Sequence, residues 1–437
     1  MDESRMSGMY LAMVERWLRS LTHRLWRRGL MRSGMVTGLI LAVLVGVLSF
    51  AYRERGRGNL HKLEAKIATD RQEAPVSLPG GQEAIELTRT RLMGGTMPEF
   101  LSVTMLPGRG MNVLQIVAYI PGKGEVNLLA SPTVEGAESA MTGTGEDADG
   151  QASLTMGGAF EAPWAGRIEG VASQVAGGRV SAVWHGHTMT LPGSAEGVAR
   201  GGLLLANAAD SAETTALPDG GQAQAVFHAG DFGAHWPSKT DVTVTVLLGS
   251  QWIELTVVAR NTGDAPEPVG IGWHPRFTIF DGNREQLRLR LPGEMREEVS
   301  DQESGLPTGV LLPVNGTAYD FTMRGGAALG KMELDDGFVA LHRDLMDNSA
   351  AAELSDPAND YGVRLTALSP TIKAFRVVAP ADADYVSIVP QFNYDDPFGR
   401  EWPKETDTGM VVLQPGQSTQ WEIRLELFSL AGNQNAK

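Results

Sequence analysis

The chain has 437 residues, no cysteine, 20% charged residues and a formal net charge of −15 at pH 7. Without cysteine it forms no disulfide and no thiolate metal site, and so acidic a protein is a poor binder of nucleic acids, whose phosphates it repels. The length allows one large domain or two of ordinary size. The charge is uneven, because residues 1–57 carry ten arginines against four acidic residues.

An uncharged, mostly apolar segment at residues 35–52 predicts a membrane span. As a helix it would rise about 27 Å, just enough to cross the hydrocarbon core of a bilayer. Seven arginines precede it, so the positive-inside rule places residues 1–34 in the cytoplasm as a basic or interfacial segment. We expect a single-pass protein of the bacterial cytoplasmic membrane, with a signal anchor at 35–52 and its C-terminal domain periplasmic or extracellular. Cleavage after Ala51, as in a signal peptide, stays open.

Residues 53–92 are polar and predict a linker. Beyond them apolar and polar residues alternate with the period of two that is typical of β-strands. The alternation is clearest on the two sides of Gly249 and Ser250, where the apolar series of Val242 and Ile253 begin. This stretch predicts a β-hairpin.

Similar units recur along the rest of the chain. Residues 178–192 predict a hairpin with its tip at His185 and His187, and residues 409–428 predict two strands joined at Pro415 and Gly416. The polar stretch 135–153 is expected to be a long surface loop. Because no long amphipathic helix and no fixed-period repeat is found, we expect residues 93–430 to form one all-β domain, a large antiparallel β-sandwich, followed by a tail at 431–437.

Four places combine polar side chains with apolar surroundings: His274 with Trp273 and Arg276; Arg167; Asp335 with Asp336; and residues 388–402, which contain Gln391, Tyr394, Asp395, Asp396 and Glu401. Aromatic rings mixed with carboxylates and amides suit sugars, whose C–H faces stack on rings while their hydroxyls bind polar groups. The alternative for His274 is a core histidine that has simply found a hydrogen-bond partner.

The order of these places resembles the aldose 1-epimerase (galactose mutarotase) family. Residues 165–168 resemble the arginine motif of the family, and residues 272–277 resemble its histidine strand. Residues 305–321 resemble the family segment that precedes the aspartate, residues 334–338 resemble the sugar-binding aspartate segment, and residues 413–416 resemble the closing turn. The resemblance implies a galactose mutarotase-like supersandwich, and a cofactor-independent isomerase with His274 as the catalytic acid. We expect substrate contacts from Arg167, Arg200, Trp273, Arg276, Asp335, Gln391 and Tyr394.

Two departures from the family pattern bear on catalysis. Valine stands at position 389, where the resemblance implies the catalytic glutamate, and Arg200 stands where it implies a second histidine. Interconversion of anomers needs a base for the anomeric hydroxyl and an acid for the ring oxygen. Valine supplies neither, so in an active enzyme the base would have to come from Asp395, Asp396 or Glu401.

Three functions stay open from the sequence. The first is an aldose 1-epimerase-like enzyme that acts on sugars outside the cytoplasmic membrane. The second is a membrane-tethered carbohydrate-binding protein that has lost turnover, a pseudo-enzyme. The third is a structural subunit of an envelope complex. We rank carbohydrate recognition of the mutarotase type first, with no cofactor, no metal and no nucleic acid as partner, and the sugar itself stays open.

Overall fold

The computed structural model describes residues 76–92, 94–172, 178–300 and 304–433. The chain divides into two compact units, residues 1–76 and 77–437, and nearly all described residues belong to the second. The predicted segments 1–34 and 35–52 lie outside the described residues, as does most of the predicted linker.

The predicted membrane location requires a correction. In the described ranges no helix is long and apolar enough to cross a membrane. The two α-helices found there, α3 (Val134–Ala140) and α4 (Leu430–Asn433), have seven and four residues, whereas a span needs about 20. The single-pass location, the membrane as a partner and the envelope complex are therefore not supported and are not carried further.

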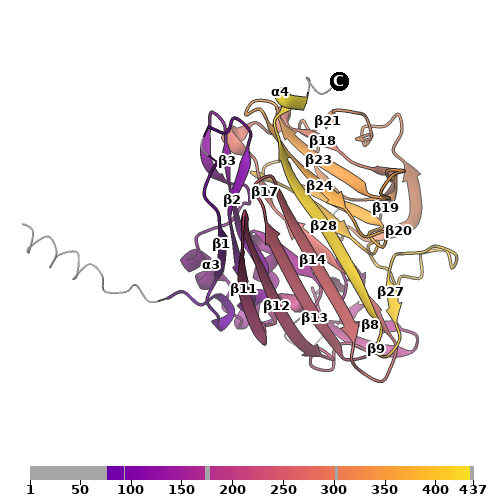
Figure 1. Cartoon of the computed structure of the whole chain (residues 1–437). Helices are drawn as coiled ribbons and strands as arrows, with labels where there is room; N and C mark the ends of the chain where they lie inside the picture. The colour runs from indigo at the N-terminus through magenta and orange to yellow at the C-terminus, as the bar shows by residue number, and fades with distance from the viewer. Residues whose placement is uncertain (1–75, 93, 173–177, 301–303, 434–437) are drawn as a thin grey trace, which may run out of the picture. The chain divides into compact units, whose positions relative to one another are not determined.

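Two large sheets form the second unit, which confirms the predicted all-β sandwich. The first has twelve strands: β1 (Ile85–Thr88), β2 (Glu99–Leu106), β3 (Asn112–Ile120), β5 (Gly158–Glu161), β16 (Gly272–Pro275), β26 (Tyr385–Gln391), β25 (Ala374–Ala379), β22 (Leu334–Leu341), β19 (Gly293–Val299) and β20 (Pro307–Pro313) in spatial order, with β4 (Gly124–Asn127) beside β3 and β17 (Phe277–Thr278) beside β26. The second has nine strands: β11 (Ser211–Leu217), β12 (Gly220–Gly230), β13 (Thr240–Leu248), β14 (Trp252–Asn261), β28 (Ser418–Phe428), β24 (Tyr361–Ala367), β23 (Ala350–Asp356), β18 (Arg288–Arg290) and β21 (Ala327–Ala328), seen side by side in Figure 1.

Three small sheets lie beside the two large ones. They are β10 (Val198–Arg200) with β6 (Arg167–Glu169), β15 (Glu267–Val269) with β27 (Val411–Leu413), and β7 (Val171–Ala172) with β8 (Arg179–Trp184) and β9 (His187–Pro192). The predicted hairpins are confirmed: β13 and β14 pair across Gly249 and Ser250, and β8 and β9 pair through the turn that ends at His187.

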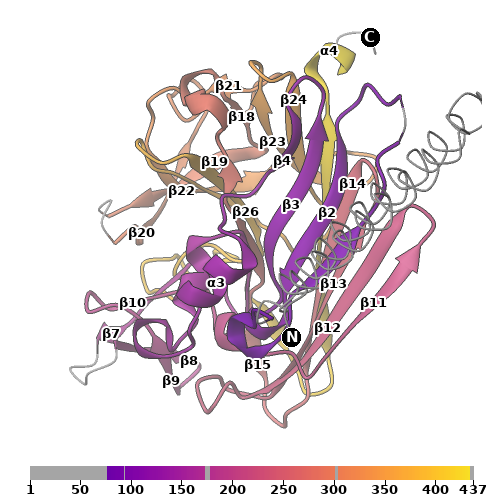
Figure 2. The ribbon, with the colours of Figure 1, turned by 90° about the vertical axis from the view of Figure 1, so that its left-hand side faces the viewer.

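The core lies between the two large sheets. Val244 of β13 and Leu255 of β14 are fully buried there, as their alternation with polar residues predicts. Trp421 of β28 meets Phe160 of β5 edge to face, with ring centroids 6.3 Å apart, so the aromatic contacts join one sheet to the other. Figure 2 shows β2 crossing β13 and β14, which it contacts at one end of the sandwich.

Alternation also gives the twelve-stranded sheet a second, more polar face. On its central strands the residues that point into the core are Phe160, Trp273, Ile388, Phe375 and Phe338. Their alternate neighbours point away from the nine-stranded sheet; these are Glu161, His274, Val389, Arg376 and Gly337. Side chains of distant parts of the sequence are thereby brought together on one surface.

Two segments differ from the sequence prediction. Strand β1 lies inside the predicted linker and pairs with β2, where Leu87 is buried. The predicted surface loop 135–153 contains helix α3, whose N-terminus is capped by Thr133 through a bond from the Gly136 amide to Oγ1. Ala137 of this helix packs in a small apolar cluster beside the sandwich. In both cases a largely polar segment is packed against the rest of the unit by one or two buried apolar side chains.

Candidate functional site

His274 is held on the polar face by a buried carboxylate. Its Nδ1 lies 3.1 Å from Oε1 of Glu161, and the other oxygen of Glu161 accepts a hydrogen bond of 3.0 Å from the Gly166 amide. The side chain of Glu161 is 3% exposed and that of His274 is 16% exposed. Within the described residues Nε2 of His274 has no hydrogen-bond partner, so this nitrogen is available to a ligand.

Glu161 was not among the residues predicted from the sequence. It stands in the apolar stretch Gly158–Glu161, and a lone carboxylate in an apolar strand is the same signal that singled out His274. Its partner was not predictable, because the pair is 113 residues apart. The register of β5 with β16, which sets His274 beside Ala159, brings the two side chains together.

Valine 389 lies directly opposite His274. The pairs Gly272–Gln391 and Phe277–Val386 share one register between β26 and the neighbouring strands β16 and β17. Counting inward from both pairs, Val389 stands at the position that matches His274. Val389 is fully buried. The position at which the resemblance implies a catalytic base is therefore on the strand next to that of His274, but it carries an apolar side chain.

Beside these strands four charged groups form a closed ring of ion pairs. Arg167 contacts Asp335 and Asp395, and Arg376 contacts the same two carboxylates. The Nη1 of Arg167 is 3.3 Å from Oδ2 of Asp395, and its amide donates a 2.9 Å hydrogen bond to Oδ1. Both arginines and Asp395 are at most 4% exposed, whereas Asp335 is 35% exposed. The ring is electrically neutral, and Asp335 is the member that reaches solvent.

Glu297 of β19 lies behind the ring and is almost completely buried. Its Oε2 accepts a hydrogen bond of 3.3 Å from the Asp395 amide. Burial raises the pKa of Glu297 to about 8, against the opposing charge of Arg167 and with a small contribution from Asp336. Burial therefore makes Glu297 hold its proton more readily than an exposed glutamate does.

Arg200 stands directly opposite Arg167 in the pair of strands β10 and β6. Its side chain is exposed, and no ion pair is found for it with any residue that the structure describes. Partial loss of hydration and the nearby charge of Arg167 lower its pKa, while Asp335 acts in the opposite direction. The charges of Arg167 and Asp335 therefore act on Arg200, but Arg200 forms no ion pair with the ring.

The other predicted contact residues are mostly occupied by the protein itself. Gln391 is buried and its Nε2 donates to the Asn393 carbonyl at 2.7 Å. Arg276 donates to the Leu154 carbonyl, and its guanidinium lies 4.3 Å from the ring centroid of Tyr385. Tyr394 is nearly buried against Trp402, and its pKa is raised to about 12, chiefly by burial.

The expected role of Trp273 needs correcting. Its side chain is fully buried on the core face of β16, and Nε1 donates to the Gly158 carbonyl at 3.0 Å. Neighbouring residues of a strand point to opposite faces, so Trp273 lies behind the sheet when His274 lies in front of it. A ligand on the polar face does not reach Trp273.

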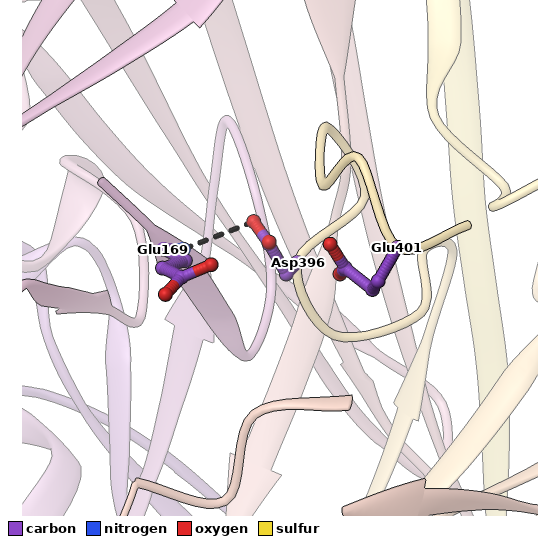
Figure 3. Close-up of side chains that lie close together, drawn as sticks. All are labelled: Glu169, Asp396 and Glu401. Carbon is purple, nitrogen blue, oxygen red and sulfur yellow. Dashed lines mark hydrogen bonds between the residues drawn. The ribbon is translucent and has the colours of Figure 1, made fainter. Parts of the chain in front are cut away.

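Asp396 and Glu401 form a carboxylate cluster with Glu169, in which oxygens of all three lie within 4.8 Å of one another (Figure 3). Oδ1 of Asp396 accepts from the Glu169 amide at 2.9 Å, and the Asp396 amide donates to the Arg167 carbonyl at 2.8 Å. Burial raises the pKa of both Asp396 and Glu401. Carboxylate oxygens can bind a hard cation. Here the hydrogen bonds of Asp396 to the backbone of β6 hold that strand in place.

The carboxylate at His274 is therefore Glu161 and not Asp395, Asp396 or Glu401. Asp395 is held in the ring of ion pairs, and the other two contact β6 and each other. Asp395 and Asp396 position Arg167, since Asp395 accepts from its backbone amide and the Asp396 amide donates to its backbone carbonyl. Of the sequence-predicted residues around the ring and the imidazole, His274, Asp335 and Arg200 are the ones whose side chains reach solvent.

Several solved structures share this fold. A galactose mutarotase-like protein from Clostridium acetobutylicum has 14% identity and a TM-score of 0.60, over 79% of this chain and 98% of that protein. An aldose epimerase homologue from C. elegans has 15% identity and a TM-score of 0.57, over 78% and 98%. A galactose 1-epimerase from Lactobacillus acidophilus has 16% identity and a TM-score of 0.53, over 79% and 99%.

A comparison with curated proteins finds no match. The sequence profile described as Aldose 1-epimerase matches residues 136–426, about two thirds of the 437 residues of the chain. The matched region includes β5, β16, β22, β25 and β26, which carry the site. The chain belongs to the aldose 1-epimerase family.

Proposed function

We propose that this protein binds an aldose sugar on the polar face of the twelve-stranded sheet, at the open groups of His274, Asp335 and Arg200. The carboxylate of Asp335 is already oriented by two buried arginines, and the imidazole of His274 is oriented by Glu161. Groups fixed in this way bind hydroxyls without the entropy cost of ordering flexible side chains. A few oriented polar groups of this kind are what a sugar site requires.

The observation that carries the functional assignment is the valine opposite His274. When the imidazole of His274 is protonated on both nitrogens, its Nε2–H is free to protonate a ring oxygen, which gives the site an acid. Val389 has no proton-accepting atom, and the partly exposed carboxylate of Asp335 already accepts hydrogen bonds from two guanidinium groups. Loss of one member of an acid–base pair costs about 10²- to 10⁴-fold in rate. We therefore propose sugar recognition with little or no acceleration of anomer exchange.

Two measurements on the full chain test this proposal. Ligand-observed NMR with D-galactose and D-glucose should detect binding, and the signal should fall when Asp335 is replaced by alanine. Polarimetry on freshly dissolved α-glucose and α-galactose should show a rate close to that of buffer. Strong acceleration by the wild type would overturn the assignment as a binding protein, and absence of any sugar binding would overturn the proposed function altogether.

A further inference from the structure

We infer that the outer edge of strand β11 is a dimer interface, on which β11 of a second copy of this chain pairs antiparallel about a twofold axis at Thr214. The nine-stranded sheets of the two copies then join edge to edge. This inference does not depend on the proposed function, because β11 carries none of the residues assigned to the sugar site.

Strand β11 stands at the end of the nine-stranded sheet with one side open (Figure 1). It pairs with β12 along its whole length, from Ser211–Val226 to Leu217–Gly220, and β12 is its sole partner among the strands that the structure describes. Every second residue of an edge strand directs its N–H and C=O away from the sheet. These groups must be hydrogen-bonded, so the outer side of β11 is a template for another strand.

Strand β11 also extends beyond the core of the sandwich. All seven of its residues are exposed, on both faces of the sheet. Its neighbour β12 alternates instead, with Ala223, Ala225 and Phe227 buried in the core. Burial against neighbours is a large part of what stabilises a strand, and β11 lacks it. A second row of hydrogen bonds on its outer side therefore stabilises β11 itself as well as joining the two copies.

The three other strands at the ends of the two large sheets are protected against such pairing. The nine-stranded sheet ends at its far side in β21, which has two residues. The twelve-stranded sheet ends in β1, which has four residues, and in β20, which begins and ends with proline. Short edge strands and prolines are devices that prevent edge pairing. Strand β11 has seven residues, no proline and no lysine, and its register with β12 is unbroken.

The charges of β11 favour a second copy of the same strand. Because the chain has a net charge of −15, a contact between two copies must avoid the acidic surface. The single charged residue of β11 is Glu213. Pairing about Thr214 sets Glu213 against the second copy's Thr215, and Thr214 against its own copy, a cross-strand pair of the stabilising kind. An axis at Glu213 would instead oppose two carboxylates, so the charges select Thr214.

The pairing closes after two copies. Seven paired residues span about 24 Å, at about 3.4 Å per residue, and the dimer uses the open side of both β11 strands. Closed twofold dimers are the commonest symmetric assemblies. The polar face of the twelve-stranded sheet points away from the nine-stranded sheet, so the proposed sugar site stays open in the dimer.

Sedimentation velocity of the full chain over a wide range of concentrations tests the inference. We expect a species of twice the 46.8 kDa of the chain that dissociates on dilution. Thr214→Lys places two lysines opposite each other at the axis and should weaken the dimer by about fivefold or more, and Thr214→Glu should do the same. An equal mixture of the two variants should form the dimer again, because lysine then faces glutamate.

Thr144→Lys is the matched control, because Thr144 is an exposed threonine at another place, and it should leave the dimer unchanged. Thermal unfolding shows that each variant is folded. A wild type that stays monomeric, or a dimer that Thr214→Lys does not weaken, would overturn the inference. Failure of the mixed variants to pair would overturn the axis at Thr214, and loss of the dimer in Thr144→Lys would show that overall charge controls association. Sugar binding should be the same in Thr214→Lys and the wild type, which separates this test from that of the proposed function.

Discussion

His274 and Val389 occupy matching positions on neighbouring strands of one sheet, in a register fixed by the pairs on either side of them. An acid and a base that act on the two oxygens of one anomeric carbon must each lie within hydrogen-bond reach of its own oxygen. The two positions are on neighbouring strands here, but one of them carries a side chain without a proton-accepting atom. The relationship suggests that a substitution at position 389 can restore the missing catalytic base.

Replacing Val389 with glutamate should create or increase anomer exchange. The new carboxylate would lie next to His274 and also near Arg376, its partner across β25 and β26. A restored base is worth about 10²- to 10⁴-fold, and we expect the lower end, because the position is fully buried and strain will weaken the effect. Polarimetry on α-galactose measures it. Val389→Gln has nearly the same shape but no base, so equal rates for the two variants would contradict the interpretation.

Replacing Glu161 with alanine should change which nitrogen of His274 carries the proton. In the neutral ring, Nδ1–H donates to the Glu161 carboxylate, which leaves Nε2 as the acceptor. The ¹⁵N shifts of the imidazole distinguish the two forms. We expect the Nδ1–H form in the wild type and mainly the Nε2–H form in Glu161→Ala, with a loss of stability of about 1–3 kcal/mol from the unpaired Gly166 amide. An unchanged ¹⁵N pattern would mean that Glu161 does not set the tautomer.

The ring of ion pairs predicts unequal costs for its two aspartates. Asp395 is 3% exposed and contacts both arginines, so Asp395→Asn should destabilise the protein by about 3–5 kcal/mol, because buried positive charge is left uncompensated. Asp335 is 35% exposed, and water can replace part of its contacts, so Asp335→Asn should cost clearly less. Denaturant unfolding of both variants measures the difference, and equal costs would argue against a buried ring.

Glu267 predicts a pH dependence of stability. It is fully buried, its Oε2 accepts from Thr240, and burial raises its pKa from 4.5 to about 7. The folded state holds this proton more tightly than the unfolded state does. Its contribution is therefore complete below about pH 4.5 and is lost as the pH rises to about 7, a change of about 3 kcal/mol.

Glu267→Gln should consequently be more stable than the wild type at pH 8, with a difference that shrinks toward pH 5. Urea unfolding at several pH values measures it. Glu213→Gln is the control, because Glu213 is exposed on β11, and it should follow the wild type. A difference between Glu267→Gln and the wild type that does not vary with pH would show that ionisation of this carboxyl is not the cause.

The sequence by itself determined the strands whose partners are close along the chain. The hairpin of β13 and β14 follows from the alternation on both sides of Gly249 and Ser250, because period-two burial and turn residues are local properties. It also identified the position of His274 and the valine at 389 as a departure from the family pattern. Each of these conclusions depends on residue types and short spacing alone.

Only the tertiary structure decided which groups meet at the site. His274 finds Glu161, 113 residues away, and Arg167 finds Asp395, 228 residues away. These contacts depend on strand order and register in the twelve-stranded sheet, which no local pattern encodes. The same register sends Trp273 into the core while its neighbour faces the site, since adjacent residues of a strand point to opposite faces.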